Sequence, residues 1–356
     1  MSKDWVNEDW VNGLDVTTPT VVTGGGGFIG GHLVAQLRSL GFDQVRAVDR
    51  KPVDEWYQHF DDVDSQVLDL GHPDAARTAA EGMGYVFHLA ADMGGMGFIE
   101  KNKALCMLSV LSSTNMLVAA RDADAQRYFY ASSACVYAED KQTDADVTAL
   151  READAYPAMP EDGYGWEKLF TERMARHFSE DFGLQTRVAR YHNVYGPSGT
   201  YDGGREKAPA AICRKVIAAK LSGRHEIEIW GDGEQTRSFM YIDDCVEGTL
   251  RLTASECRKP VNVGSSEMVT INEMVSMCEK IAGVTLERRY KLDAPLGVRG
   301  RNSDNELIAA ELGWEPSIRL FDGLERTYAW IYDQMMSPSS APSSAAPQVP
   351  VLSATP

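Results

Sequence analysis

The chain has 356 residues, 44% of them hydrophobic and 24% charged, which fits an ordinary soluble globular protein with one large domain or two. Its 35 basic and 52 acidic residues give a net charge of −17, which argues against a nucleic-acid partner, because binding phosphate chains needs clustered Lys and Arg. We identify no stretch approaching the roughly 20 apolar residues that span a bilayer and no N-terminal signal core, and therefore expect a cytoplasmic protein without a membrane partner.

The chain begins with a polar arm, residues 1–17. From residue 18 to residue 195, short β-branched runs alternate with helical segments, a pattern typical of a parallel sheet covered by helices on both faces. We therefore expect an α/β fold in which 18–195 form a Rossmann-type, doubly wound parallel sheet that binds NAD. A segment at about 238–265 has the same core pattern and is expected to return to this domain.

After residue 195 the sequence changes to a Gly-rich loop followed by helices and short strands. We expect a smaller, mixed α/β C-terminal substrate-binding subdomain built from 196–237 and 266–336. Residues 337–356 are rich in Pro, Ser and Ala, a composition that predicts a disordered tail.

The run VVTGGGGFIGG places Gly24, Gly27 and Gly30 between an apolar strand and a helix. Glycines at this spacing allow a tight turn, close approach of the backbone to a pyrophosphate, and close contact between helix and strand. Phe28 and Ile29 belong to the same turn and are included in the expected cofactor site. The context favours dinucleotide binding over a merely flexible glycine loop.

Acidic residues at strand ends extend this site. Asp49 ends the next predicted strand, where its carboxylate would bind the ribose hydroxyls and repel a 2′-phosphate, which favours NAD. Arg50 and Lys51 follow it, and such cations can instead serve the 2′-phosphate of NADP. Asp69 ends another predicted strand and could bind the adenine amine, or act only as a helix cap or turn residue.

The stretch DGYGWEKLFTE contains Tyr164 and Lys168, four residues apart and therefore on one helix face. Alone, they could be an ordinary surface pair. With the glycine turn and with Ser133 at a strand end, they resemble the extended short-chain dehydrogenases/reductases. The resemblance implies that Lys168 and an oxidised nicotinamide lower the pKa of Tyr164, whose phenolate accepts a proton from a hydroxyl that Ser133 also binds.

A closer resemblance, to the GDP-mannose 3,5-epimerase family, rests on five stretches: LAADMGGMGFI (89–99), FYASSACVYAEDKQ (129–142), RYHNVYGPSGTYDGGREKAPAAICRK (190–215), WGDGEQTRSF (230–239) and GVRGRNSDN (297–305). Similarity runs over roughly residues 18–333. The chain departs from the family pattern at Ala138, where Pro or Gly is usual, and in VIAAKLSGRHEIEI, which is longer than the family's segment.

This resemblance implies a nucleotide-sugar epimerase that converts GDP-mannose to GDP-L-galactose and GDP-L-gulose. Oxidation at C4 by Tyr164 and NAD would acidify the hydrogens on C3 and C5, and later re-reduction would leave the NAD bound. Cys135, two residues after Ser133 and expected at the end of the same strand, would be the base; Lys207 in GGREKAP would be the opposing acid. Cys135 could instead be a buried small hydrophobe, and Lys207 a solvated charge or a diphosphate ligand.

The resemblance also implies contacts to a GDP-sugar. Lys215, Arg237 and Arg301 suit its diphosphate, and Arg offers bidentate geometry. Lys215 could instead form a surface ion pair, and the sequence does not separate Arg301 from Arg299. The expected substrate-binding set is Gly94, Ser133, Cys135, Asn193, Glu206, Lys207, Ala208, Lys215, Gln235, Thr236, Arg237 and Arg301.

The other cysteines lack paired spacing and a CxxC motif, so we expect no disulfide framework and no metal site. Four of them, Cys213, Cys245, Cys257 and Cys278, are assigned to packing.

Two other functions stay open at this point: a GDP-sugar epimerase that inverts only C5 or only C3, and a catalytically inactive, NAD-binding regulatory protein. A 4-epimerase has no use for the Cys/Lys pair, and a 4,6-dehydratase normally carries an acidic residue at position 135. Apolar positions in 103–120 and in the helix with Tyr164 fit the dimer faces of the family, although core-facing stripes would look the same. We expect a homodimer.

Overall fold

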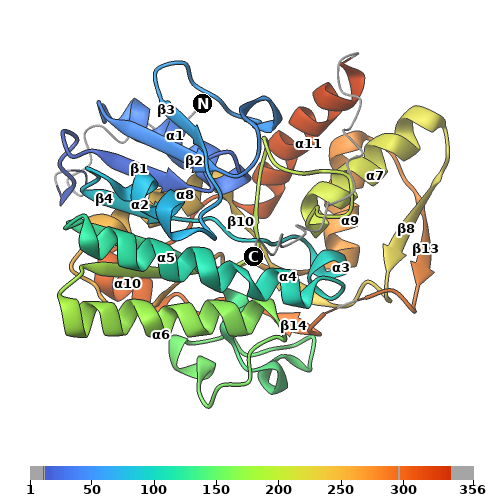
Figure 1. Cartoon of the computed structure of the whole chain (residues 1–356). Coiled ribbons are helices and arrows are strands. Elements are labelled where there is room, and N and C mark those ends of the chain that lie inside the picture. The colour runs from blue at the N-terminus through green and yellow to red at the C-terminus, as the bar shows by residue number, and fades with distance from the viewer. Residues whose placement is uncertain (1–10, 12, 296, 338–356) are drawn as a thin grey trace, which may run out of the picture.

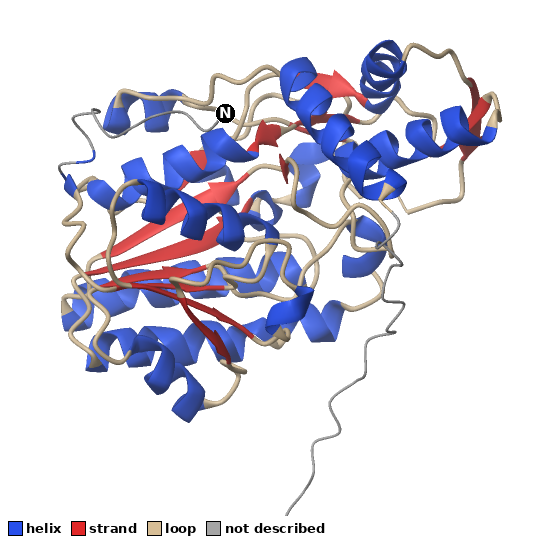
Figure 2. Cartoon of the chain, turned by 90° about the horizontal axis from the view of Figure 1, so that it is seen from above, coloured by secondary structure: helices blue, strands red, loops and turns tan. Residues whose placement is uncertain are grey.

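The computed structural model of the protein describes residues 11, 13–295 and 297–337 (Figure 1). Most of the predicted N-terminal arm, and the predicted tail apart from Ser337, lie outside the described residues. Within them, one large sheet carries helices on both faces, and a smaller group of helices and short strands lies beside it (Figure 2).

The large sheet has seven strands in the order β11-β6-β5-β4-β1-β2-β3, and every pair in it is parallel. Its strands are β1 (Thr20–Thr23), β2 (Val45–Asp49), β3 (Asp64–Val67), β4 (Tyr85–His88), β5 (Arg127–Ser133), β6 (Thr186–Tyr191) and β11 (Val261–Val263). The strand order reverses between β1 and β4, and open α/β sheets bind ligands at the carboxyl ends of such strands. The predicted α/β class with a Rossmann-type parallel sheet is confirmed.

The central strands are buried on both faces, which explains their nearly continuous apolar sequences. Along β1 and β4 the side chains alternate between two cores: Val21 and Val86 pack into one, Val22 and Phe87 into the other. Each fully buried side chain of this size contributes roughly 2 kcal/mol relative to an exposed one. The sheet is therefore a rigid frame for the loops at its carboxyl edge.

Helices cover both faces of the sheet (Figure 1). On one face α2 (Pro73–Ala80), α5 (Ser109–Asp122) and α6 (Tyr164–Phe182) pack side by side; on the other lie α1 (Phe28–Ser39) and α8 (Ile242–Ala254). Short helical segments in the connections are η2 (Val53–Glu55), α3 (Met96–Ile99), α4 (Lys103–Met107), η3 (Ala134–Val136), η4 (Glu139–Gln142) and η5 (Glu152–Ala155).

The smaller group combines segments that are distant in sequence. Helices α7 (Ala208–Ser222), α9 (Ile271–Ala282) and α11 (Leu320–Met336) pack together, and α10 (Glu306–Leu312) contacts β11. Three small sheets accompany them: β8 (Glu226–Trp230) with β13 (Glu287–Lys291), β7 (Val194–Tyr195) with β10 (Met240–Tyr241), and β9 (Thr236–Ser238) between β12 (Met268–Thr270) and β14 (Gly300–Arg301). The domain boundaries given above stay a prediction.

One expectation needs correction. The helical stretch Lys103–Asp122, made of α4 and α5, is long and apolar enough to cross a membrane by length and composition. Ser, Thr and Asn interrupt its apolar run, so that inspection of the sequence missed it. Since α5 packs against α2 and α6 over the sheet, and 39% of the apolar 18-residue window within the stretch is buried, we interpret it as a core helix of this fold.

Candidate active site

The glycine turn lies between the carboxyl end of β1 and the start of α1. Gly24 has a φ of +75°, which favours glycine, and a Cβ on Gly30 would collide with the Gly24 carbonyl oxygen. Phe28 and Ile29 form the first residues of α1, whose N-cap, Gly27, provides no side-chain hydrogen bond. The first amides of α1 can therefore receive a pyrophosphate, and the turn fits the predicted dinucleotide.

The cations next to Asp49 are bound elsewhere. Arg50 donates to Asp92 Oδ1 at 2.5 Å, and Lys51 Nζ donates to the Gly26 carbonyl oxygen at 2.6 Å. Asp49 stands at the end of β2 and accepts the Lys51 amide with Oδ1 at 3.0 Å. Both cations thus bind groups of the protein, whereas NADP would need a cation for its 2′-phosphate. The arrangement fits NAD.

Asp69 lies two residues beyond β3, which ends at Val67, and not at the strand end as predicted. Its Oδ1 accepts the Gly71 amide at 2.9 Å, so the carboxylate closes a turn. This geometry matches the turn-residue alternative for that oxygen. A contact of Asp69 with adenine stays a prediction.

Tyr164 and Lys168 lie on the first turns of α6, and both are almost completely buried. The Lys168 ammonium is 5.5 Å from the centroid of the Tyr164 ring and 4.7 Å from that of Tyr130. The structure therefore brings the pair together on one helix face.

In the protein alone, the pKa of Tyr164 is raised. Burial raises it well above the ordinary value, the charges of Cys135 and Glu167 raise it further, and a hydrogen bond with Ser133 lowers it. A phenolate in this buried place costs desolvation energy that Lys168 does not offset within the protein alone. The lowering predicted for Lys168 together with an oxidised nicotinamide stays a prediction.

Cys135 lies in a different structural element from the one predicted. Strand β5 ends at Ser133, and Cys135 lies in the 3₁₀ turn η3. Ser133 Oγ caps this turn by accepting the Cys135 amide at 3.2 Å, which replaces strand alternation as the cause of their proximity. The Cys135 side chain packs in one buried cluster with Tyr164 and Cys106.

Three basic side chains interact with Cys135. Arg301 Nη1 lies 3.8 Å from Cys135 Sγ, and Lys207 and Arg237 are close enough for the Cys135 charge to act on their pKa values. Cysteines that act as bases or nucleophiles lie in electropositive surroundings of this kind. The arrangement can therefore support proton abstraction.

Lys207 is the N-cap residue of α7 and ends the Gly-rich loop that follows β7. The Gly95 amide donates to the Arg205 carbonyl at 3.1 Å, and a Cβ on Gly95 would collide with the Glu206 carbonyl. These contacts fix the loop against the connection that follows β4. Desolvation lowers the pKa of Lys207, whereas the Cys135 charge raises it.

Replacement of Lys207 by Met is expected to stabilise the protein near pH 7. The folded-state pKa lies below the ordinary value of 10.5, so below that pH the unfolded chain binds more protons and Lys207 opposes folding. Thermal unfolding should show a midpoint about 1–2 °C higher for Lys207→Met at pH 7, and a smaller gain at pH 10.5. The matched control is Lys101→Met at an exposed position; a lower midpoint for Lys207→Met at pH 7 contradicts the prediction.

Arg301 and Arg237 face each other across two paired strands, because β14 and β9 are in register at these residues. Arg301 is buried; it is ion-paired with Glu161, donates to Gln142 Oε1 at 2.6 Å, and contacts Cys135. Arg237 donates to the carbonyls of Thr236 and Val298.

The structure distinguishes Arg299 from Arg301 by their contacts. The Arg299 guanidinium forms a bidentate pair with Asp232 at 2.8 and 3.0 Å, whereas that of Arg301 contacts Cys135. Lys215 donates to the Glu228 carbonyl at 2.9 Å and lies 6.0 Å from the Trp230 ring. Its Nζ also lies 3.9 Å from Glu228 Oε1, which matches the ion-pair alternative, and its role at a diphosphate stays a prediction.

The remaining predicted substrate residues surround the same region. Asn193 has a φ of +43°, uncommon outside glycine, and donates to the Ser238 carbonyl at 3.0 Å. Gln235 Nε2 donates to the Trp230 carbonyl, and its Oε1 has no hydrogen-bond partner among the described residues. The others are Gly94 beside Phe98, Glu206 paired with Arg214, Ala208 at the start of α7, and Thr236 bound to the Ala145 carbonyl.

Two buried carboxylates were missed by the sequence reasoning. Glu161 and Glu167 lie three residues before and after Tyr164, and both are at most 5% exposed. Charged residues are almost never buried without partners. Their spacing around Tyr164 in EDGYGWEK was the available signal.

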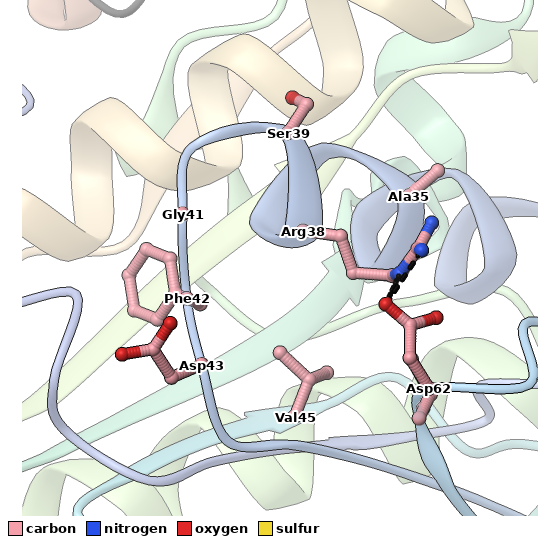
Figure 3. Close-up of a pocket in the computed structure, with 9 residues that line it drawn as sticks. Ala35, Arg38, Ser39, Gly41, Phe42, Asp43, Val45 and Asp62 are labelled. Atoms are coloured by element: carbon pink, nitrogen blue, oxygen red, sulfur yellow. Dashed lines mark hydrogen bonds and ion pairs between the residues drawn. The ribbon is translucent and has the colours of Figure 1, made fainter.

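A pocket at the opposite edge of the sheet does not belong to this site. It lies where α1 leads into β2, and Arg38 in it is bound to Asp62 (Figure 3). Ligands of open α/β sheets bind at the carboxyl ends of the strands, not at this amino edge. Among the described residues, no group of three His, Cys, Asp or Glu could hold a metal ion.

The fold and the site define a class of enzyme, and sequence comparison agrees. Residues 20–264 match the model of the NAD dependent epimerase/dehydratase family, and the chain belongs to this family, whose cofactor is NAD. It is 49% identical over 315 residues to GDP-mannose 3,5-epimerase 1 of Oryza sativa subsp. japonica, and 48% identical over 315 residues to GDP-mannose 3,5-epimerase of Arabidopsis thaliana. Each comparison covers 88% of this chain and 82% of the relative. The recognised resemblance is confirmed.

Solved structures agree in fold. UDP-glucose 4-epimerase from Thermotoga maritima, solved with UDP-glucose, has a TM-score of 0.79 and 25% identity. MoeE5, solved with UDP-glucose and NAD, has a TM-score of 0.73 and 29% identity. Both comparisons cover 89% of this chain and 99% of the solved chain.

Proposed function

We propose that the protein is a GDP-mannose 3,5-epimerase that converts GDP-mannose to GDP-L-galactose and GDP-L-gulose. The identity of 48–49% to enzymes of that name supports the substrate. The observation that carries the proposal is the Cys135 thiol, which lies among Lys207, Arg237 and Arg301 and packs with Tyr164. A base and an acid beside an oxidation site are what inversion next to a ketone requires.

The protein's residues would act in a closed cycle. Tyr164 accepts the proton of the C4 hydroxyl, while Ser133 holds the same oxygen by a hydrogen bond. When bound, NAD supplies the hydride acceptor and donor for C4, and its oxidised form adds a positive charge that favours the Tyr164 phenolate. The C4 ketone acidifies the C5 and C3 hydrogens. Cys135 removes such a proton from one face and Lys207 delivers one to the other, before Tyr164 returns its proton to C4.

The short distance between Arg301 and the Cys135 thiol indicates a further role for this arginine in the cycle. The Glu161 and Gln142 side chains hold its guanidinium, and Nη1 lies 3.8 Å from Cys135 Sγ. We assign Arg301 to stabilising the thiolate as well as to the predicted contact with the substrate. Arg237 and Lys215 are then the first candidates for the diphosphate.

Incubation of GDP-mannose with the purified protein in D₂O tests the function. Deuterium at both C3 and C5, located by NMR in galactose- and gulose-configured products, supports the double epimerase. Deuterium at C5 alone indicates the single-site epimerase. Absence of any label from a protein that carries NAD contradicts the assignment and leaves the inactive, regulatory protein as the alternative.

We also propose a cytoplasmic homodimer joined through α5 and α6. Leu111 on α5, Leu108 at the N-cap of α5, and Trp166 and Phe170 on α6 are between 42% and 58% exposed, and α5 and α6 lie side by side on one face (Figure 1). Apolar patches of this kind mark interaction surfaces.

Leu111→Glu is expected to shift the protein from twice the chain mass to the chain mass in light scattering at micromolar concentration. A buried, unpaired charge at a dimer interface costs several kcal/mol, or about 10²-fold or more in the dissociation constant. The exposed Leu221→Glu on α7 is the control and should stay dimeric. A wild-type protein with the mass of one chain contradicts the proposal.

A further inference from the structure

Helix α6 carries more than the Tyr164–Lys168 pair on the face that it turns to the site. Tyr164, Glu167, Lys168 and Thr171 follow one another at i, i+3, i+4 and i+7, the spacing of a single helix face. All four are buried, and the Glu167 side chain has no exposed surface. A carboxylate in that position needs partners, because removing its water is costly.

The partners of Glu167 come from three elements. Its Oε1 accepts hydrogen bonds from the hydroxyls of Ser113 on α5, Tyr130 on β5 and Thr171 on α6, each at 3.2 Å. Its Oε2 accepts no hydrogen bond from the described residues and lies 3.7 Å from Lys168 Nζ. One oxygen is thus fixed to the frame of the fold, and the other is directed at the lysine.

The network continues beneath the site to the switch point of the sheet. Ser113 Oγ lies 3.3 Å from His88 Nε2, and His88 Nδ1 lies 2.7 Å from Thr23 Oγ1. Burial, with a smaller part from the Lys168 charge, lowers the pKa of His88 to about 3. His88 is therefore neutral near pH 7, and the network contains one negative charge, on Glu167, opposite the positive charge of Lys168.

We propose that Glu167 is a positioning residue for the Tyr164–Lys168 pair: its carboxylate, fixed by three hydroxyls, holds the Lys168 ammonium between the Tyr130 and Tyr164 rings. The inference rests on the proposed function only where it concerns turnover. The titratable groups that face Tyr164 and Glu167 are Cys106, Cys135, Tyr128, Tyr130, Lys168 and His88.

Removal of the Glu167 charge has two consequences. Lys168 becomes a buried cation without its counter-charge, so its ammonium moves or draws in water. Tyr164 loses a neighbouring negative charge that raises its pKa, so its pKa falls. Glu167→Gln keeps the size of the side chain and one acceptor oxygen, which makes it the suitable variant.

The first readout does not use activity. The protein is labelled with 3-fluorotyrosine, whose phenol titrates at lower pH than tyrosine, and the Tyr164 resonance is assigned by its loss in Tyr164→Phe. The ¹⁹F titration midpoint of residue 164 is expected about one pH unit lower in Glu167→Gln than in the parent protein. Glu167→Asp keeps the charge but withdraws it from the three hydroxyls and from Lys168, so its midpoint should lie between those of the parent protein and of Glu167→Gln.

The second readout is the pH profile of deuterium exchange into GDP-mannose. In Glu167→Gln the ascending limb is expected to move to lower pH, with kcat reduced about tenfold and KM within about twofold, since Glu167 touches no substrate. Glu172→Gln is the control, because Glu172 is an equally buried carboxylate of α6 that pairs with Arg190 at 2.7 Å instead of Lys168. Glu172→Gln should lower the melting temperature and leave the pH of the ascending limb unchanged.

The inference is overturned if the ¹⁹F titration midpoint of Tyr164 in Glu167→Gln equals that of the parent protein. It is also overturned if Glu172→Gln shifts this midpoint by the same amount as Glu167→Gln. If Glu167→Gln does not fold, Ser113→Ala decides instead: loss of one hydroxyl that fixes the carboxylate should move the midpoint in the same direction, and an unchanged midpoint overturns the inference. Failure of the proposed function would appear separately, as absence of exchange in the parent protein with the ¹⁹F result unaffected.

Discussion

Cys135→Ala is expected to lower deuterium incorporation at C5 and C3 of GDP-mannose by about 10³-fold. The variant loses the group that we assign as base, while Tyr164 and Lys168, which act at C4, remain. The sulfur fills little space at its position in η3, so the fold should tolerate the change. NMR of the nucleotide sugars recovered from D₂O measures the loss.

Cys106→Ala is the matched control for this result. Cys106 belongs to the same buried cluster as Cys135 and Tyr164, but burial raises its pKa to about 11, and the cycle assigns it no role. Its removal should change exchange by less than about threefold. Full exchange in Cys135→Ala would remove the thiol from the mechanism.

Tyr164→Phe is expected to reduce all turnover by about 10³-fold or more, because without the hydroxyl no group accepts the C4 proton. The phenyl ring keeps the contacts of Tyr164 with Cys135 and Lys168, so the melting temperature should change by no more than about 2 °C. Exchange at C5 and C3 should vanish with oxidation, since neither carbon is acidic without the C4 ketone.

The two variants differ in one further measurement. Cys135→Ala should still form reduced cofactor transiently when mixed with substrate, because its block lies after oxidation; Tyr164→Phe should form none. Stopped-flow absorbance of the reduced nicotinamide separates them. Reduced cofactor in Tyr164→Phe at the parent rate would show that another group accepts the proton.

Short-range patterns predicted the parts of the site that local geometry determines. The glycine turn and the i, i+4 relation of Tyr164 and Lys168 depend only on a strand–turn–helix unit and on helix periodicity. Cys135 was assigned to the wrong element, because the Ser133 hydroxyl caps a 3₁₀ turn that strand alternation cannot reveal. The capping potential of Ser was visible in the sequence, but its use here was not.

Long-range pairing determined the rest. Arg299 and Arg301 look equivalent in GVRGRNSDN, and only the register of β14 on β9 and the position of Asp232 separate them. The pKa of Tyr164 depends on burial and on charges contributed by other elements. Glu167 shows why motifs are incomplete: its three hydroxyl partners are spread over 113, 130 and 171.

The short pairing of β14 with β9 also sets the order in which this centre can assemble. Arg301 contacts a thiol 166 positions earlier in the chain, whereas the seven-stranded sheet is complete by Val263. During synthesis, the sheet with its glycine turn and its Tyr164–Lys168 pair can therefore form before Arg301 leaves the ribosome. A nascent chain of that length would possess the oxidising half of the site without the full positive surroundings of Cys135, so that the capacity for epimerisation arises last.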